Sequence, residues 1–223
     1  HTINEVVLVA TNNTSKLMAK NKLKNIARLS GQKIKFQIIL NNNVSAFIKN
    51  YRKLTEDIYC AVISTPDHTH FNIIKKCLIN KYHCLTVKPA VERLDQLNEL
   101  IKISKKNKLY GAVEFHKRFD RQALIMKDKF QTGGIGDPLY TWTEYSQRKI
   151  VPKNFFKSWV SKNNVFQYLG IHYVDLIRFV TNAKPTKVLA LGQKNYLIKN
   201  GTKTEDSIQA IVEWITPNRK KFS

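Results

Sequence analysis

Short apolar runs alternate with segments of helical periodicity through the first half of the chain. The apolar runs are rich in Val, Ile and Leu, and they predict buried strands at residues 5–10, 33–40, 58–64, 82–87 and 109–115. Between the runs, apolar residues recur at helical spacing, as Leu94, Leu97 and Ile101 do. Strands that alternate with helices of this length indicate right-handed βαβ units. We therefore expect an α/β fold with a parallel sheet and helices on both faces.

The pattern differs in the second half of the chain. Residues 119–137 predict a helix closed by a glycine-rich turn, and residues 165–182 have a helical period. Residues 138–149 alternate as a strand with one solvated or ligand-facing side does. Further strands are predicted at 185–196 and 206–214. Together these segments predict a second, α+β domain with a mainly antiparallel sheet.

The chain is strongly basic, with 38 Lys and Arg residues against 16 Asp and Glu residues and a formal charge of +22. A charge of this size is typical of proteins that bind nucleic acid or an anionic membrane surface. The lysines are scattered over the exteriors of predicted helices, however, and we identify no helix-turn-helix, zinc finger or RNA-binding aromatic motif. We therefore expect no specific nucleic acid partner, and a basic nucleic-acid-binding protein is the minor alternative.

The sequence indicates neither a membrane helix nor a disulfide framework. No apolar stretch approaches the roughly 20 residues that a membrane helix needs, so no membrane partner is expected. The three cysteines, Cys60, Cys77 and Cys84, include no C-x-x-C motif, which argues against disulfides or a zinc ribbon, and no metal site is predicted. We interpret all three as core residues of a protein from the reducing cytoplasm.

Polar side chains follow several predicted strands at the point where each strand ends. Lys88 and Pro89 follow the strand at 82–87. Residues 64–70 (STPDHTH) follow the strand before it, and residues 116–120 (HKRFD) follow the strand after it. Parallel sheets of this kind bind ligands at the carboxyl ends of their strands. Lys88 therefore stands at the expected ligand edge, with a solvated charge in a βα loop as the alternative interpretation.

The predicted helix at 165–182 carries polar side chains on an otherwise apolar sequence. Tyr168, His172 and Asp175 fall at positions i, i+4 and i+7, which places them on one face. A histidine in this setting is usually a hydrogen-bonded core residue. Together with Lys88, however, His172 forms the pair of converging groups that proton transfer in one pocket requires.

These motifs, in this order, resemble those of the Gfo/Idh/MocA family, which comprises NAD(P)-dependent oxidoreductases of sugars and polyols. The family's T-P-x-x-x-H, E-K-P and G-x-H-x-x-D stretches are matched by Thr65, Pro66 and His70, by Lys88 and Pro89, and by Gly170, His172 and Asp175. The resemblance spans almost the whole chain. It implies a Rossmann-like NAD(P)-binding domain over residues 1–118 and an α+β substrate or oligomerisation domain over residues 119–223.

The sequence also departs from the family pattern. The glycine-rich phosphate loop is absent, and residues 5–10 match the second family strand, so we expect a fragment that lacks the first βα unit and the end of the second domain. Thr11 and Asn12 stand where an acidic residue usually holds the ribose, which makes NADP as well as NAD an expected cofactor. Val87 replaces the family glutamate before Lys-Pro, and Tyr168 replaces an aspartate that helps the histidine handle the substrate.

The resemblance implies that a sugar or polyol hydroxyl loses a proton to a base while its carbon gives hydride to the nicotinamide. The implied base is His172, since an unperturbed histidine has a pKa of about 6.5, and Lys88 would stabilise the charge that develops on oxygen. Tyr168 adds a hydroxyl to this catalytic network or fills space. The implied cofactor-binding residues are Thr11, Asn12, Ser64, Thr65, Pro66, His70, Lys88 and Pro89. The predicted substrate-binding residues are Lys88, Asp175 and His172, together with Arg118 and Tyr145. Arg118 follows a strand end and either faces the pocket or pairs with an acid, and Tyr145 either lines the substrate site or lies on the outer face of a sheet.

The principal alternative is a cofactor-binding or scaffold homologue without turnover, which Val87 and Tyr168 would permit. In either case the full-length form is expected to be a homo-oligomer, because the second-domain sheet of such proteins often forms a dimer interface. The sequence names neither the sugar nor the choice between NAD and NADP.

Overall fold

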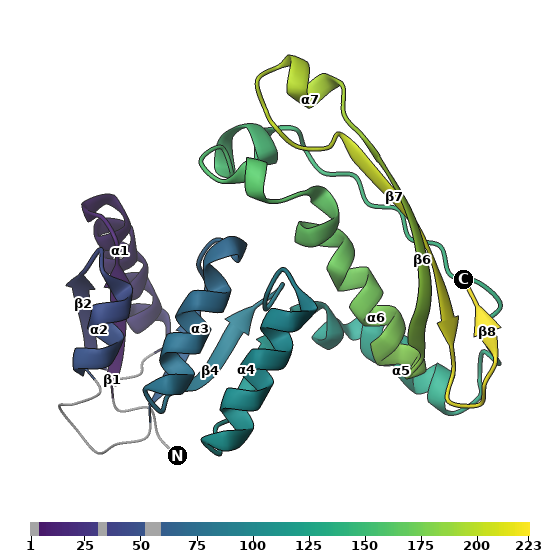
Figure 1. Cartoon of the computed structure of the whole chain (residues 1–223), viewed down its shortest axis with the longest axis horizontal. Helices are drawn as coiled ribbons and strands as arrows, with labels where there is room; N and C mark the ends of the chain where they lie inside the picture. Colours follow the sequence, from purple (N-terminus) through teal and green to yellow (C-terminus); the bar gives the residue numbers. More distant parts are fainter. Residues whose placement is uncertain (1–4, 31–34, 52–58) are drawn as a thin grey trace.

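The computed structural model of the protein describes residues 5–30, 35–51 and 59–223. Figure 1 shows parallel strands with helices in the first half of the chain, and a long antiparallel hairpin beside two helices in the second half. The expected order, a Rossmann-like parallel region followed by an α+β region, is therefore confirmed. The position of the domain boundary at residues 118 and 119 stays a prediction.

Strands and helices alternate along the first half of the chain, as the apolar periodicity predicts. The elements are β1 (Glu5–Ala10), α1 (Asn13–Ser30), β2 (Lys35–Leu40), α2 (Val44–Tyr51), β3 (Cys60–Ile63), α3 (His70–Ile79), β4 (His83–Val87), α4 (Leu94–Lys106) and β5 (Gly111–Glu114). The beginnings of two predicted strands, at residues 33–34 and at residue 58, lie outside the described residues.

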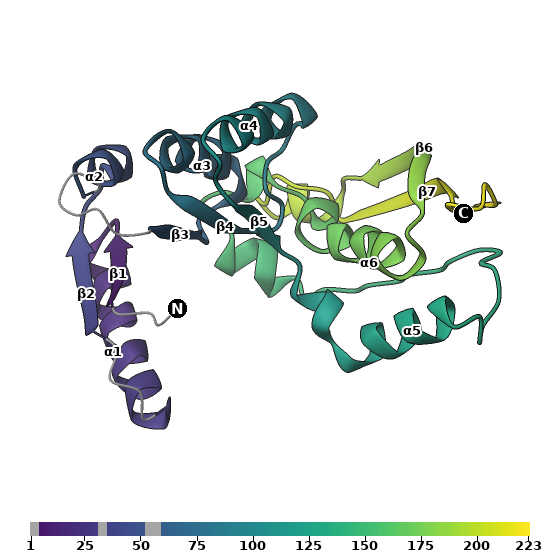
Figure 2. The same cartoon turned by 90° about the horizontal axis from the view of Figure 1, so that it is seen from below.

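All strand pairs in this half are parallel, and they form two sheets among the described residues. β1 pairs with β2, while β4 pairs with β3 on one side and with β5 on the other. Figure 2 shows α3 and α4 together along one side of the three-stranded sheet. Consecutive right-handed crossovers that step in one direction along a sheet place their helices on the same face.

The core of this half lies where α3 and α4 cover β3 and β4. Its buried side chains are those of Ile48, Ile63, Ile74, Cys77, Leu78, Tyr82, Cys84 and Leu100. Two of the cysteines thus have the predicted core positions, but Cys60 is exposed and its prediction is wrong. Cys60 begins β3, which is an outer strand of its sheet as far as the described residues show, so no described strand covers it on that side.

The parallel register brings the carboxyl ends of three strands to one edge of the sheet. Ile63 of β3 lies beside Thr86 of β4, and Val87 of β4 lies beside Glu114 of β5. The loops after these strands contain single helical turns at Asp67–Thr69 and His116–Phe119. The segments selected from the sequence therefore open at the same edge.

The second half forms an antiparallel sheet with two long helices on one side. Its elements are α5 (Arg121–Gln131), helical turns at Val151–Phe155, Val160–Lys162 and Phe166–Gly170, α6 (Ile171–Thr181), β6 (Lys184–Gln193), α7 (Tyr196–Lys199), β7 (Ser207–Ile215) and β8 (Lys221–Phe222). The strand order is β6-β7-β8. Val174 and Ile177 of α6 pack against the buried Trp214 and Phe222, which fixes the helix on the sheet.

The strand predicted at residues 138–149 does not form. Within the described part of the chain this stretch has no ladder partner, and a backbone hydrogen bond from Thr141 N to the carbonyl of Ser223 connects it to the last residue. Leu139 and Trp142 are exposed. Alternation of side chains favours a strand only where a neighbouring strand accepts its hydrogen bonds.

None of the helices in the described ranges is long and apolar enough to span a bilayer.

Candidate active site

A pocket of about 420 Å³ opens at the carboxyl edge of β3, β4 and β5, against the N-terminal turn of α6. Its walls come from both halves of the chain. The first half contributes Thr65, Asp67, Val87, Lys88, Glu114, His116 and Lys117, and the second contributes Tyr145, Trp159, Tyr168, Leu169, His172 and Tyr173. The volume lies within the range typical of small-molecule sites.

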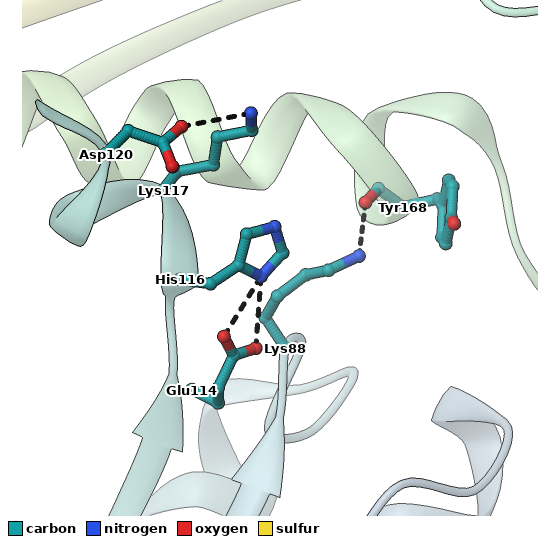
Figure 3. A network of polar contacts seen from close by, with 6 residues as sticks. All are labelled: Lys88, Glu114, His116, Lys117, Asp120 and Tyr168. Carbon is teal, nitrogen blue, oxygen red and sulfur yellow. Dashed lines mark hydrogen bonds and ion pairs between the residues drawn. The ribbon is translucent and has the colours of Figure 1, made fainter. Parts of the chain in front are cut away.

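Lys88 reaches across the pocket from the end of β4. Its Nζ donates a hydrogen bond to the backbone carbonyl of Tyr168 and lies 4.2 Å from the centroid of the Tyr168 ring, and Figure 3 shows this reach. The Lys88–Pro89 peptide bond is cis. Burial lowers the pKa of Lys88, and the carboxylates of Asp67 and Glu114 oppose that effect. The ammonium group is therefore a directed and partly desolvated donor.

His172 faces the same pocket from the first turn of α6. The residue is only 3% exposed, and its Nδ1 has no hydrogen-bond partner among the described residues. Burial lowers the pKa of His172 to about 4, with further lowering by the positive charge of Lys88. His172 is therefore neutral at neutral pH, the form in which an imidazole accepts a proton.

Tyr168 lies in the wide helical turn Phe166–Gly170 that precedes α6. Its ring packs edge-on against Phe156, with 4.6 Å between the centroids. The Lys88 ammonium lies over the same ring. A Cβ on Gly170 would lie 2.7 Å from Cδ2 of Phe166, so the turn needs glycine at that position. Tyr168 thus presents a carbonyl and a ring face to Lys88, two features that a helical wheel does not reveal.

Asp67 lies in the wall of the pocket and is a residue that sequence reasoning missed. It is buried, and its Oδ2 accepts a 2.7 Å hydrogen bond from Nδ2 of Asn163 in the second half of the chain. Burial raises the pKa of Asp67, while His70 and Lys88 act against that rise. Its place in the STPDHTH loop, directly after a buried strand, was the signal that pointed to it.

Glu114, His116 and Lys117 also line the pocket and were not selected as site residues. His116 Nδ1 lies 3.0 Å from Oε1 of Glu114, and Lys117 Nζ lies 3.2 Å from Oδ2 of Asp120 (Figure 3). Glu114 ends β5, and the other two residues follow that strand closely. The expectation that ligands bind at the carboxyl ends of parallel strands therefore also pointed to them. Trp159, by contrast, had no signal in the sequence.

The predicted cofactor-binding residues fall into two groups. Thr65 lines the pocket, while Thr11 and Asn12 are exposed at the end of β1 and do not. His70 is fully buried, and its ring nitrogens lie 2.8 Å from the carbonyl of Thr65 and 2.7 Å from that of Pro89. His70 therefore ties the loop after β3 to the loop after β4. The side chains of Ser64 and Pro66 are at least partly exposed beside it.

The predicted substrate-binding residues are also divided by the structure. Arg118 and Asp175 form a two-point ion pair, with Nε to Oδ2 at 2.7 Å and Nη2 to Oδ1 at 2.5 Å, and neither lines the pocket. Tyr145 does line it, and its ring centroid lies 5.9 Å from that of Tyr173. Lys88 and His172 also line it, so three of the five lie at the pocket.

The fold and the pocket at the strand ends are those of a nucleotide-binding α/β oxidoreductase. Residues 6–115 match the model of the oxidoreductase family with an NAD-binding Rossmann fold, and residues 124–215 match the model of the GFO/IDH/MocA C-terminal domain. The chain therefore belongs to the Gfo/Idh/MocA family. The predicted nicotinamide cofactor, NAD or NADP, agrees with the NAD-binding Rossmann domain of this family.

Similar proteins include an uncharacterized oxidoreductase, YrbE, of Bacillus subtilis and the myo-inositol 2-dehydrogenase of Thermotoga maritima. YrbE is 27% identical over 77% of this chain and 50% of its own length. The Thermotoga enzyme is 23% identical over 65% of this chain and 43% of its own. The chain thus spans about half the length of these curated relatives.

Solved structures share the fold. The myo-inositol 2-dehydrogenase of Lactobacillus plantarum has a TM-score of 0.73 at 18% identity, over 97% of this chain and 60% of that one. The scyllo-inositol dehydrogenase of Lactobacillus casei, solved with NAD(H) and scyllo-inositol, has a TM-score of 0.67 at 18% identity, over 99% and 68%.

The pocket residues are of the kinds that would suit the nicotinamide ring of such a cofactor and a polar substrate beside it. Polar groups converge at the strand ends, and a buried imidazole nitrogen, Nδ1 of His172, lacks a partner. A buried polar atom without a partner is costly unless a ligand or water satisfies it. The sequence of the first described strand and helix contains no glycine-rich loop of the kind that binds a pyrophosphate.

Proposed function

We propose that the chain carries the active site of an NAD(P)-dependent dehydrogenase that acts on a hydroxyl group of a sugar or polyol. The observation that supports this most is the convergence of Lys88, from the first half of the chain, and His172, from the second half, on one pocket. The two groups come from positions 84 residues apart and share no secondary-structure element. Such convergence of a directed cation and a neutral buried imidazole is expected of a proton-transfer site.

In this proposal His172 removes the proton from the substrate hydroxyl, and Lys88 hydrogen-bonds the same oxygen. The Tyr168 carbonyl holds the Lys88 ammonium at the pocket, so this donor is oriented before the substrate arrives. The nicotinamide, when bound beside Lys88 and Thr65, supplies the acceptor for the hydride that leaves the carbon. Proton and hydride thus leave the same alcohol, whose carbon becomes a carbonyl.

The particular cofactor is part of the same proposal. Thr11 and Asn12 present no carboxylate at the end of β1, and removal of that charge removes a repulsion against a 2′-phosphate. We therefore include NADP with NAD.

We also propose the domain division at residues 118 and 119, a cytoplasmic location and a homo-oligomer. The exposed apolar side chains of β6, including Val188, Leu189 and Leu191, support the last of these.

The alternative, a cofactor-binding homologue without turnover, is favoured by one contact. The Lys88 ammonium already has the Tyr168 carbonyl and ring as partners, and a substrate oxygen has to share or displace them. Val87, which also lines the pocket, adds no carboxylate to the site. In this alternative the pocket binds a nicotinamide and releases it unchanged.

The first test is cofactor binding. A form of the protein extended upstream through the expected glycine-rich loop is titrated with NADH and NADPH, and nicotinamide fluorescence is followed. Lys88→Ala is expected to weaken binding of the preferred cofactor by about tenfold, since it removes a partly buried charge-assisted donor. Lys102→Ala, an exposed lysine on α4, is the control and should bind as the parent does.

A screen of polyols and sugars with the preferred cofactor then separates the two proposals. Turnover that disappears in Lys88→Ala and His172→Gln supports the dehydrogenase. Binding without turnover across the screen supports the inactive homologue. If the folded protein binds neither cofactor, both proposals are wrong.

A further inference from the structure

The proton that His172 removes needs a route to solvent. His172 is 3% exposed, and no carboxylate or other polar group among the described residues hydrogen-bonds its Nδ1. Asp175, one turn further along α6, is paired with Arg118. Each turnover protonates His172, and His172 must release this proton before it can act as a base again. The structure offers a neighbouring group for this transfer.

That neighbour is His116, at the start of the loop after β5. Its ring centroid lies 4.5 Å from that of His172, with the ring planes at 64°. Its side chain is 56% exposed, so it contacts both the buried histidine and the solvent. Both histidines line the pocket, and they come from the two different halves of the chain.

Glu114 gives His116 a defined orientation. The carboxylate oxygens of Glu114 lie 3.0 and 3.2 Å from Nδ1 of His116, and Figure 3 shows both contacts. Because a carboxylate only accepts hydrogen bonds, Nδ1 of His116 carries hydrogen and Nε2 keeps the lone pair that takes up a proton. Once His116 is charged, the carboxylate stabilises the imidazolium.

The other charged groups at the pocket have other partners or carry positive charge, so Glu114 is the group that stabilises a protonated histidine. Asp67 is engaged by Asn163, and Lys117 is paired with Asp120. Lys88 and Lys117 add positive charge, which disfavours a lasting His172 cation and favours its rapid loss of the proton. Of the acids on the strands and loops that face His172, Glu114 is the one whose charge favours the protonated imidazole.

We propose that Glu114 and His116 form a carboxylate–imidazole pair that carries the proton of the reaction between His172 and solvent. This rests on the dehydrogenase function proposed above. The substrate hydroxyl proton passes to His172, then to Nε2 of His116, directly after a small ring rotation or through one bridging water, and finally to bulk water. The reverse reaction uses the same route inward, and no group changes its oxidation state in these transfers.

The test uses the extended protein and the variants His116→Gln and Glu114→Gln, which keep size and hydrogen bonding but remove the proton acceptor or its charge. In dilute buffer without imidazole, His116→Gln is expected to lower kcat at least about tenfold, as loss of acid–base assistance does. Added imidazole should restore kcat, because it replaces the lost proton carrier, while the Kd for the cofactor stays unchanged. Asp95→Asn, which breaks an exposed ion pair with Arg93 on the surface, is the control.

Unchanged kcat in His116→Gln, or a loss that imidazole does not restore, overturns the proposal. A readout that needs no turnover separates this failure from failure of the proposed function. NMR of the histidine ring signals in the labelled protein follows the titration of His172. Because His116 lowers the pKa of His172 and Glu114 raises it, His116→Gln is expected to raise the His172 midpoint and Glu114→Gln to lower it. If the wild-type protein shows these shifts but turns over no polyol, the dehydrogenase proposal fails and no reaction proton remains for the Glu114–His116 pair to carry. If it turns over polyols and neither variant changes the His172 midpoint, the relay alone is wrong.

Discussion

At the scale of single residues, burial decides the charge of the histidine that the sequence selected. An imidazole on a solvated helix titrates near neutral pH, whereas His172 is enclosed and lies near two cationic side chains. The resulting pKa of about 4 keeps it neutral over the physiological range. The sequence indicated a histidine of suitable spacing, but the neutral state follows from its surroundings.

Protein stability should therefore depend on pH through His172. Its folded pKa of about 4 lies below the ordinary value of 6.5, so unfolding takes up a proton between these values and stability falls as pH drops through this window. The expected contribution is roughly 2–3 kcal/mol between pH 7 and pH 4. Urea unfolding at both pH values should show a smaller difference for His172→Gln than for wild type. Equal pH dependence in the two proteins would contradict the shift.

The contact between Tyr168 and Lys88 makes a second prediction at this scale. The backbone carbonyl and the ring face supply the contacts, and phenylalanine retains both. We expect Tyr168→Phe to change the cofactor Kd less than about threefold, whereas Tyr168→Ala removes a cation–π contact of about 1 kcal/mol. Nicotinamide fluorescence measures both. A loss of binding in Tyr168→Phe as large as in Tyr168→Ala would assign the contribution to the hydroxyl.

At the scale of elements, the Arg118–Asp175 pair joins the turn after β5 to the middle of α6. It fixes the helix that carries His172 relative to the loop that carries His116. The Asp175 side chain is 8% exposed and that of Arg118 is 35% exposed, so the pair is mostly removed from water. A broken pair of this kind leaves a charge without compensation.

Asp175→Asn should consequently destabilise the protein by about 2–3 kcal/mol. The matched control is Asp95→Asn, which breaks the solvent-exposed pair with Arg93 and should destabilise the protein far less. Chemical denaturation measures both. Similar small effects in the two variants would mean that the buried pair contributes no more than a surface contact.

The segment at residues 138–149 shows that a local alternating pattern is not sufficient to form a strand. The alternation at residues 138–149 is that of a strand, but no described strand pairs with it and the segment stays without a ladder. The two later strands form as predicted, because each supplies the other's hydrogen bonds along β6 and β7. A strand is a property of two segments, so one segment alone cannot determine it.

At the scale of the whole molecule, the pocket exists because the two halves of the chain meet at it. Asp67 and Asn163 are joined by a buried hydrogen bond across 96 residues, and Lys88 and Tyr168 are joined across 80. The Thr204 hydroxyl in turn donates a hydrogen bond to the backbone carbonyl of Asn163. These contacts place the loops of the parallel sheet against α6.

Asn163→Ala should loosen this junction. It leaves a buried oxygen of Asp67 without its donor, at an expected cost of about 2 kcal/mol. Asn80→Ala is the control, since Asn80 is half-buried and its side chain donates to the carbonyl of Lys76, four residues back in the adjoining helix α3. Hydrogen exchange should rise in the loops after β3 and before α6 in Asn163→Ala alone. Unchanged exchange there would show that the hydrogen bond does not connect the halves.

The sequence by itself determined the succession of strands and helices, the ligand edge of the parallel sheet and the family motifs that carry Lys88 and His172. These follow from periodicities of two and 3.6 residues and from strand direction, which are local properties. Only the tertiary structure decided that Arg118 pairs with Asp175, that Tyr168 holds Lys88 through its backbone, and that Glu114 and His116 stand beside His172. The physical reason is that such contacts join residues whose partners lie far apart in sequence or depend on a particular ring or carbonyl orientation. Packing of the two halves, and not any local pattern, selects those orientations.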